Sequence, residues 1–276
     1  MNDTDPVLSE PVLDGGPLLE TDPLLEVRGA GHRYGDRYGC RDVDLDLWPG
    51  EVLAVVGESG SGKSTLVGML SQQLSLSQGI IRYRTADGTM LDLARQSEAA
   101  VRHLWRTEWG FVHQNPADGL RMHVSAGGNI GEPLMATGWR HYGEVRAAAA
   151  EWLRRVEIPV DRIDDPPVTF SGGMRQRLQI ARSLVVSPRL VFMDEPTSGL
   201  DVSVQARLLD LIRGLVTELG LAIIIVTHDL AVARLISHRT LVMKDGRVIE
   251  SGLTDRVLDD PQAAYTQLLV SSILQG

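Results

Sequence analysis

The feature that most constrains this chain is a glycine-rich stretch, GESGSGKS at residues 57–64, which directly follows the apolar run VLAVV at residues 52–56. A continuous apolar run of this length is typical of a strand that is buried on both faces. Apolar residues then recur at helical spacing, at Leu66, Met69 and Leu70. Strand, glycine-rich loop and helix in this order predict an α/β fold with an anion-binding loop at one edge of a parallel sheet.

The glycine-rich loop fits the pattern G-x-x-x-x-G-K-[ST], in which each residue type has a physical task. Glycines let the backbone curl so that successive amide groups point at one phosphate, and the start of the helix adds its positive dipole end. Lys63 supplies a mobile positive charge, and the Ser64 hydroxyl is a Mg²⁺ ligand. We call residues 57–64 the P-loop. The residues expected to bind nucleotide in and beside it are Gly57, Ser59, Gly60, Ser61, Gly62, Lys63, Ser64 and Thr65.

A flexible glycine- and serine-rich linker before a helix is the alternative interpretation of this loop. Strand, loop, lysine and helix coincide here, which argues against it. Lysine is also scarce in this chain, since the 27 basic residues include only Lys63 and Lys244 as lysines. A lysine that is retained where arginine is otherwise preferred indicates a need for a compact ammonium group.

A second apolar run, LVFM at residues 190–193, ends in the acidic pair Asp194 and Glu195. An apolar strand that ends in acids places carboxylates at the carboxyl edge of the sheet, where ligands bind in α/β folds. We expect Asp194 to hold Mg²⁺ and Glu195 to polarise an attacking water as general base. A solvated acidic pair at a strand end is the alternative, and the presence of the P-loop weakens it.

Two further motifs accompany these runs. His228 follows a third apolar run, AIIIV at residues 222–226, and SGG at residues 171–173 opens an amphipathic helix pattern. A histidine after a strand is ordinarily structural or a helix cap, but this one falls at the same sheet edge as Asp194, within reach of a terminal phosphate. The Ser-Gly-Gly turn offers a hydroxyl, free amide groups and a helix dipole end, and a simple helix N-cap is an equal alternative.

The remaining patterns outline the fold. Residues 204–219 have helical apolar spacing, and Gly220 stands where a C-cap glycine belongs, which completes a strand–helix–strand unit of a parallel sheet. Residues 115–187 lack buried-strand runs and carry two amphipathic helix patterns, so we expect a helical subdomain there. Asp245-Gly246 between two short apolar runs predicts a β-hairpin.

The N-terminal segment differs in composition from the rest of the chain. Residues 1–22 contain six acidic residues and no basic residue, with prolines at short intervals, which predicts a flexible acidic tail over residues 1–24. Residues 25–276 then form the folded domain. Net charge is −9, which disfavours a nucleic-acid partner.

The chain is expected to work in the cytoplasm. No apolar run approaches the roughly 20 residues that span a bilayer, and the N-terminus lacks the charged and apolar regions of a secretory signal. Cys40 is the only cysteine, so an intrachain disulfide is impossible, which fits a reducing compartment.

In order and spacing, these motifs resemble the nucleotide-binding domain of ATP-binding-cassette (ABC) proteins. The motifs that carry the resemblance are the P-loop, FSGGM at 170–174, DEPTSGLD at 194–201 and His228. The resemblance covers residues 25–270. It implies an α/β fold with a mostly parallel core sheet, an antiparallel β subdomain and a helical subdomain, and it implies hydrolysis of ATP with Mg²⁺.

The resemblance also implies further roles. Gln114 resembles the glutamine that contacts Mg²⁺ and the γ-phosphate side, and Tyr34 resembles the aromatic residue that stacks on adenine, with an ordinary strand aromatic as the alternative. The implied catalytic residues are Glu195, His228 and Gln114, and the implied Mg²⁺ ligands are Ser64, Gln114 and Asp194.

In this family the signature turn of one chain closes over the ATP of its partner. Ser171, Gly172 and Gly173 would therefore bind the nucleotide of a second ABC subunit, identical or related. Met174 replaces the glutamine of the commoner signature, a substitution that would remove a polar contact to that nucleotide.

Five segments resemble the ATP-binding subunits of the phosphonate carbon–phosphorus lyase system in particular: residues 106–110, 118–120, 124–132, 134–138 and 267–272. This implies a soluble ATPase that docks on the lyase core complex without inserting into a membrane. The ATPase subunit of a peptide, nickel or phosphonate importer is the alternative. A third hypothesis is a clamp that binds ATP without hydrolysing it, and Glu195 and His228 argue against it.

Overall fold

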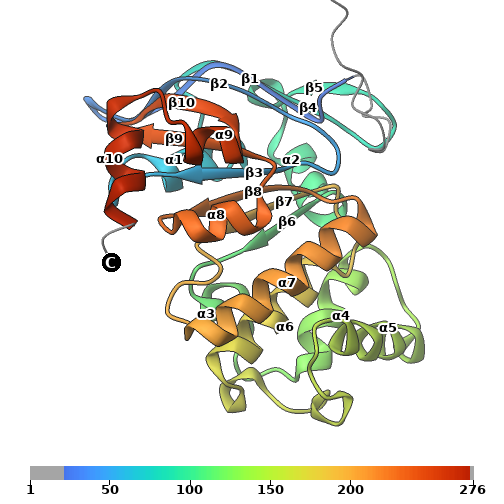
Figure 1. The fold of residues 1–276 in the computed structure, drawn as a ribbon. Helices are drawn as coiled ribbons and strands as arrows, with labels where there is room; N and C mark the ends of the chain where they lie inside the picture. The colour runs from blue at the N-terminus through green and yellow to red at the C-terminus, as the bar shows by residue number, and fades with distance from the viewer. Residues whose placement is uncertain (1–21, 274–276) are drawn as a thin grey trace, which may run out of the picture.

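A computed structural model describes residues 22–273, so most of the predicted acidic tail lies outside the described residues. Two β-sheets and the helices around them make up the described chain (Figure 1). The strands are β1 (Leu25–Tyr34), β2 (Arg37–Leu47), β3 (Val52–Val56), β4 (Gln78–Arg84), β5 (Met90–Asp92), β6 (Trp109–Val112), β7 (Leu190–Asp194), β8 (Ala222–Thr227), β9 (Arg239–Lys244) and β10 (Arg247–Leu253).

Helices connect most of these strands. They are α1 (Lys63–Leu70), α2 (Glu98–Thr107), α3 (Pro116–Gly119), α4 (Ala126–Ala136), α5 (Tyr142–Arg155), α6 (Gly172–Leu184), α7 (Val202–Leu219), α8 (Leu230–Ile236), α9 (Thr254–Asp259) and α10 (Ala264–Ile273), with short 3₁₀ turns at Leu93–Arg95, Val160–Arg162 and Pro167–Thr169.

The larger sheet has six strands in the order β10-β9-β3-β8-β7-β6. Strands β9, β3, β8, β7 and β6 run parallel, and β10 pairs antiparallel with β9. The three apolar runs of the sequence become its central strands β3, β8 and β7. The prediction of a mostly parallel core sheet is therefore confirmed.

Both faces of this sheet are buried, which explains the continuous apolar runs. Along β3, Leu53 and Val55 join one apolar cluster, whereas Val52, Ala54 and Val56 join the other. Apolar residues of α6, α7 and α8 belong to the cluster that contains Val52, Ala54 and Val56, so these helices cover that face of the sheet. A strand without a solvent-facing side has no reason to alternate polar and apolar residues.

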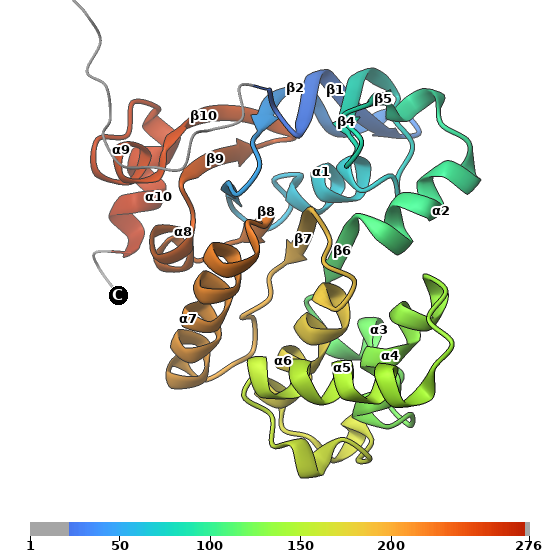
Figure 2. The same ribbon diagram turned by 90° about the vertical axis from the view of Figure 1, so that its right-hand side faces the viewer.

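The smaller sheet is antiparallel, as the family resemblance implied, and its strand order is β2-β1-β4-β5. Val43, Leu45 and Leu47 of β2 are buried, and Asp44 between them is exposed. Helix α1 packs between the two sheets (Figure 2), since its apolar residues share one cluster with residues of both. Cys40 of β2 is fully buried in this layer, and burial raises the pKa of its thiol.

The chain between β6 and β7 forms the third layer. Within residues 113–189 the structure has helices and turns but no strand, and α3, α4, α5 and α6 lie together below the larger sheet (Figures 1 and 2). The division of the chain into subdomains stays a prediction.

Two predicted chain reversals are confirmed. Helix α7 ends at Gly220, which has a φ of 62°. In the turn from β9 to β10, Asp245 and Gly246 have φ values of 49° and 75°, the left-handed pair that a two-residue hairpin turn requires.

A hydrogen-bonded junction joins the larger sheet to the helical layer at the residue that follows β6. The His113 N–H donates to Gln179 Oε1 (2.7 Å), and the His113 carbonyl accepts from Gln179 Nε2 (3.0 Å). Gln176 Nε2 reaches the same carbonyl at 3.3 Å. Both glutamines are buried on α6, so the strand that leads to Gln114 is fixed against the helix that Ser171 opens.

This junction predicts unequal effects for two similar substitutions on α6. Gln179→Met leaves the His113 N–H without its partner, so we expect the free energy of unfolding to fall by about 2 kcal/mol. Gln176→Met removes one longer bond to a carbonyl that keeps Gln179, and should cost less than about 1 kcal/mol. Denaturant unfolding of both variants measures the difference. Equal losses would contradict the role given to Gln179.

Candidate active site

The predicted site residues converge because of the parallel topology. Strands β3, β8, β7 and β6 are neighbours with the same direction, so their carboxyl ends form one edge of the sheet. The P-loop follows β3, His228 follows β8, Glu195 follows β7, and Gln114 lies two residues beyond β6. Residues that are far apart in the sequence thereby meet at one edge.

The P-loop curls around the ammonium group of Lys63. Lys63 Nζ donates to the carbonyls of Gly57 and Glu58, both at 2.8 Å. The residue is only 6% exposed. Burial lowers the pKa of Lys63, and the carboxylates of Glu195 and Asp194 oppose this shift. The P-loop thus holds a positive charge that is largely shielded from solvent.

A second buried group in the P-loop points to a ligand. Ser61 is 4% exposed, and its hydroxyl has no hydrogen-bond partner among the described residues. Buried hydroxyls in proteins are almost always paired. An anion bound in the loop would supply the missing partner, which agrees with the predicted phosphate site.

Asp194, the last residue of β7, carries a disfavoured negative charge. Burial raises the pKa of its carboxyl, the neighbouring Glu195 raises it further, and Lys63 and the Ser64 hydroxyl act in the opposite direction. Two neighbouring carboxylates beside a serine hydroxyl suit a divalent cation such as Mg²⁺. Within residues 22–273 no group of three or more His, Cys, Asp or Glu side chains is arranged to hold a metal without a ligand's help.

The Glu195 carboxylate is held from two sides. Gln114 Nε2 donates to its Oε2 at 3.1 Å and also reaches Ser198 Oγ at 3.3 Å. His228 Nδ1 lies 3.1 Å from its Oε1. The three predicted catalytic residues therefore meet in the structure, and the contact between His228 and Glu195 is one that sequence reasoning did not anticipate.

Glu195 itself has an unusual backbone. Its φ is 43°, in the left-handed region that non-glycine residues rarely adopt, and its N–H donates to the Val226 carbonyl at 2.9 Å. Strained conformations of this kind cluster at functional sites because the surrounding structure maintains them. No local pattern around Asp194 and Glu195 predicts this turn.

The helix-cap alternative for His228 is wrong. Asp229 caps α8, since its Oδ1 accepts the Ala231 N–H at 2.8 Å. The His228 side chain is 61% exposed and projects toward Glu195.

Tyr34 lies at the end of β1, 53% exposed, beside the P-loop helix. A Cβ atom at Gly39 would be 2.7 Å from both a Tyr34 ring carbon and the Thr65 methyl, which shows how near the ring is to α1. The ring packs edge to face with His32, with centroids 4.5 Å apart, and about half of it stays open to solvent.

The Ser-Gly-Gly turn lies in the helical layer and does not join the residues at the sheet edge. Ser171 caps α6, its hydroxyl accepting the Met174 N–H at 3.3 Å, so the N-cap alternative holds. Helix α6 lies in the helical layer, away from α1 (Figures 1 and 2). No hydrogen bond within the described part of the chain joins Ser171, Gly172 or Gly173 to the P-loop. Met174 packs against the apolar core.

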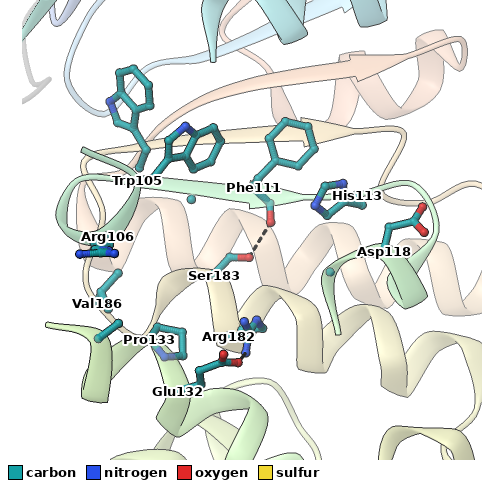
Figure 3. Close-up of a pocket in the computed structure, with 14 residues that line it drawn as sticks. Trp105, Arg106, Phe111, His113, Asp118, Glu132, Pro133, Arg182, Ser183 and Val186 are labelled. Atoms are coloured by element: carbon teal, nitrogen blue, oxygen red, sulfur yellow. Dashed lines mark hydrogen bonds and ion pairs between the residues drawn. The ribbon is translucent and has the colours of Figure 1, made fainter. Parts of the chain in front are cut away.

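A groove lies beside this edge, between β6 and the helical layer (Figure 3). Its volume is about 410 Å³, and the rings of Trp105, Trp109 and Phe111 line one wall. On the opposite wall Arg182 Nη1 pairs with Glu132 Oε2 at 2.8 Å. The groove reaches His113, one residue before Gln114, so it adjoins the site of the predicted chemistry.

Comparison with known proteins identifies the relatives of this chain. The profile of the family described as ABC transporter matches residues 40–198. The Escherichia coli K12 protein PhnK, named for phosphonates utilization and ATP binding, is 66% identical over 254 residues, which are 92% of this chain and 99% of that protein. A Brucella melitensis protein named for peptide import and ATP binding, BMEII0863, is 38% identical, with 92% of this chain and 79% of that protein covered.

Solved structures with the same fold include two cassettes. MJ0796, as a dimer in a post-hydrolysis state bound to ADP and Pi, aligns with a TM-score of 0.73 and 27% identity, over 83% of this chain and 98% of that one. CbiO1 from Clostridium perfringens, part of the transporter complex cbiONQ, aligns with a TM-score of 0.74 and 29% identity, over 91% and 97% of the two chains. None of the helices within residues 22–273 has the length and apolarity to cross a bilayer.

The raised pKa of Asp194 predicts that Asp194→Asn stabilises the nucleotide-free protein. Burial and Glu195 outweigh the favourable attraction to Lys63, so at neutral pH the ionised carboxylate opposes folding, and this penalty disappears as the pH falls through the raised pKa. We expect an increase of about 0.5–2 kcal/mol in the free energy of unfolding at pH 7, the range typical of stabilising substitutions. Denaturant unfolding at pH 7 and at acidic pH measures it, and a stability loss at pH 7 would contradict the charge argument.

Proposed function

Because the chain belongs to the ABC transporter family of ATP-binding proteins, we propose that it binds Mg-ATP and hydrolyses it with Glu195 as general base, as the ATP-binding subunit of the carbon–phosphorus lyase machinery for phosphonates. The observation that carries the catalytic part is the meeting of Lys63, Asp194, Glu195, Gln114 and His228 at one sheet edge. The 66% identity to a protein named for phosphonates utilization supports the cellular part.

Each part of the site has a chemical task. The P-loop amides and Lys63 bind the β- and γ-phosphates, and Tyr34 stacks on adenine. Ser64, Gln114 and Asp194 would hold Mg²⁺, which when bound neutralises charge that develops on the phosphates. The Lys63 ammonium leaves the carbonyls of Gly57 and Glu58 for phosphate oxygens, a stronger interaction because both donor and acceptor are charged.

Glu195 accepts the proton of the attacking water. Each carboxylate oxygen offers about two lone pairs, so Glu195 can keep its bonds to Gln114 and His228 and still accept a third from water. The two partners orient the carboxylate, which matters because a general base acts only within hydrogen-bond reach of the proton.

Two chains are needed to complete the site. Ser171 caps α6, which lies in the helical layer away from α1 (Figure 1), and the turn presents amide groups at a helix N-terminus. We infer that this turn closes over the nucleotide of an identical or related chain. The dimeric form of MJ0796 is in line with such a pairing.

The groove of Figure 3 is the surface we assign to the lyase core complex. Its lining includes Arg106, Asp118, Glu132 and Ala136, which fall within the segments that carry the resemblance to lyase-system subunits. An importer subunit would use the same nucleotide residues, but the peptide-import relatives are less similar, at 38% identity or below. A cytoplasmic location follows from this proposal and fits the single buried cysteine, Cys40.

Substitution of the proposed base tests hydrolysis. Glu195→Gln keeps the shape of the side chain but cannot accept the proton, so ATP turnover should fall by about 10²–10⁴-fold while ATP remains bound. The variant should accumulate as a closed dimer with ATP, measured as a mass increase by light scattering. Lys63→Ala in the same background is the control, since it should abolish the ATP-dependent increase.

Two results would contradict this mechanism. Unchanged turnover in Glu195→Gln would favour the clamp that binds ATP without hydrolysing it. The same mass with and without ATP would contradict the paired-chain site.

Affinity purification from a phosphonate-degrading host tests the partner. We expect soluble lyase subunits to co-purify with the chain. Ala136→Arg, which places a long charged side chain at the groove, should reduce this recovery at least about tenfold without changing ATP affinity. Tyr142→Ala, on an exposed part of α5 outside the groove lining, is the matched control. Recovery of membrane permeases in place of lyase subunits would reject this partner and favour the importer.

A further inference from the structure

The C-terminal helix α10 contacts the P-loop, although no motif of the sequence links them. The Glu58 N–H donates to the Tyr265 hydroxyl at 3.1 Å, across 207 positions of sequence. Tyr265 is half-buried and packs against the apolar core, so its ring has a fixed place. A shift of α10 would therefore also move Glu58 at the start of the P-loop.

Tyr265 and Lys63 hold opposite ends of one peptide group. The carbonyl of Gly57 accepts from Lys63 Nζ at 2.8 Å, and the N–H of the same peptide is the Glu58 group bound by Tyr265. Because the peptide is planar, its two ends turn together. When Lys63 turns to a phosphate, this peptide loses its bond to Lys63 and keeps its bond to Tyr265.

Lys244 adds a second contact to the same tyrosine. Its Nζ lies 4.7 Å from the centroid of the Tyr265 ring, within the range of a cation–π interaction. Lys244 begins the β9–β10 turn, in which the Gly246 N–H donates to the Ser61 carbonyl at 2.9 Å. Lys244 thus links the hairpin turn to α10, and both of these elements contact the P-loop.

The start of α10 is itself fixed to the sheet. Glu250 of β10 accepts the N–H groups of Gln262 (2.7 Å) and Ala263 (3.1 Å) just before the helix. Tyr265 is therefore carried by a segment that is anchored at β10.

From these contacts we propose that Tyr265 and Lys244 are positioning residues that hold the P-loop in its phosphate-binding conformation before nucleotide arrives. A loop whose amides already converge loses less conformational freedom on binding, so the pair favours binding of ATP and ADP alike. This inference rests on the proposed nucleotide-binding function. Neither residue reaches the Glu195 carboxylate through a described contact, so the chemical step is left unchanged.

The test is ADP binding by calorimetry with the full-length protein. Tyr265→Phe removes only the hydroxyl and Lys244→Met removes the charge, and each should raise the Kd for ADP by about threefold to tenfold. Lys244→Arg keeps a cation over the ring and should bind as the wild type does. In ATPase assays, Tyr265→Phe should raise KM by a similar factor and change kcat less than about twofold, the pattern of lost uniform binding.

Tyr142→Phe is the control, because Tyr142 is an exposed tyrosine on α5 in the helical layer. Wild-type ADP affinity in Tyr265→Phe, or an equal loss in Tyr142→Phe, would overturn the inference while the proposed function stands. Weaker binding in Lys244→Arg to the same extent as in Lys244→Met would overturn the role of the cation. Failure of the wild-type protein to bind ADP would overturn the proposed function and this inference with it.

Discussion

The candidate site is built around one buried positive charge, the ammonium group of Lys63. An ammonium group that leaves water is costly unless polar groups surround it. Lys63 is 6% exposed, and the protein surrounds it with two loop carbonyls and, across the sheet edge, the carboxylates of Asp194 and Glu195. The carbonyls come from the loop between β3 and α1 and the carboxylates from the end of β7, and β3 and β7 are parallel strands that have β8 between them. The parallel sheet therefore brings together the groups that stabilise the buried ammonium, and this positive charge suits the sheet edge to the phosphate binding that we propose.

Local sequence patterns were sufficient for the central strands, the β9–β10 hairpin and helices α1, α6 and α7, and they placed the candidate site residues at one sheet edge. The apolar runs that become β3, β7 and β8 have no polar alternation because both sheet faces are covered, and strand direction then fixes which residues share an edge. Turn chemistry at Asp245-Gly246 was equally readable, since few residues adopt a positive φ.

Contacts between distant segments could not be predicted in this way. Gln179 and Gln176 resemble the polar face of an amphipathic helix, yet both are buried against His113. The contact of His228 with Glu195 and the left-handed backbone of Glu195 depend on how β7 and β8 end side by side. Tyr265 carries no motif at all, and only the tertiary fold brings it to Glu58. Such features arise from packing, and a single sequence does not encode them in its spacing.

The short strand β6 links the groove to the Glu195 carboxylate. Trp109 and Phe111 line the groove, and two residues beyond the strand Gln114 reaches Glu195 at 3.1 Å. His113 between them is fastened to α6. A partner that shifts β6 would therefore move both Gln114 and the helix that presents Ser171, which gives a physical route between docking and hydrolysis.

The burial of Cys40 has a practical consequence for work on this protein. Its thiol lies in the core of the smaller sheet with a raised pKa, so little thiolate is exposed to alkylating or oxidising reagents. A maleimide dye or spin label would therefore spare the native cysteine. One introduced cysteine at the groove rim and another at the signature turn would report distances between subunits during turnover, with no need to build a cysteine-free background first.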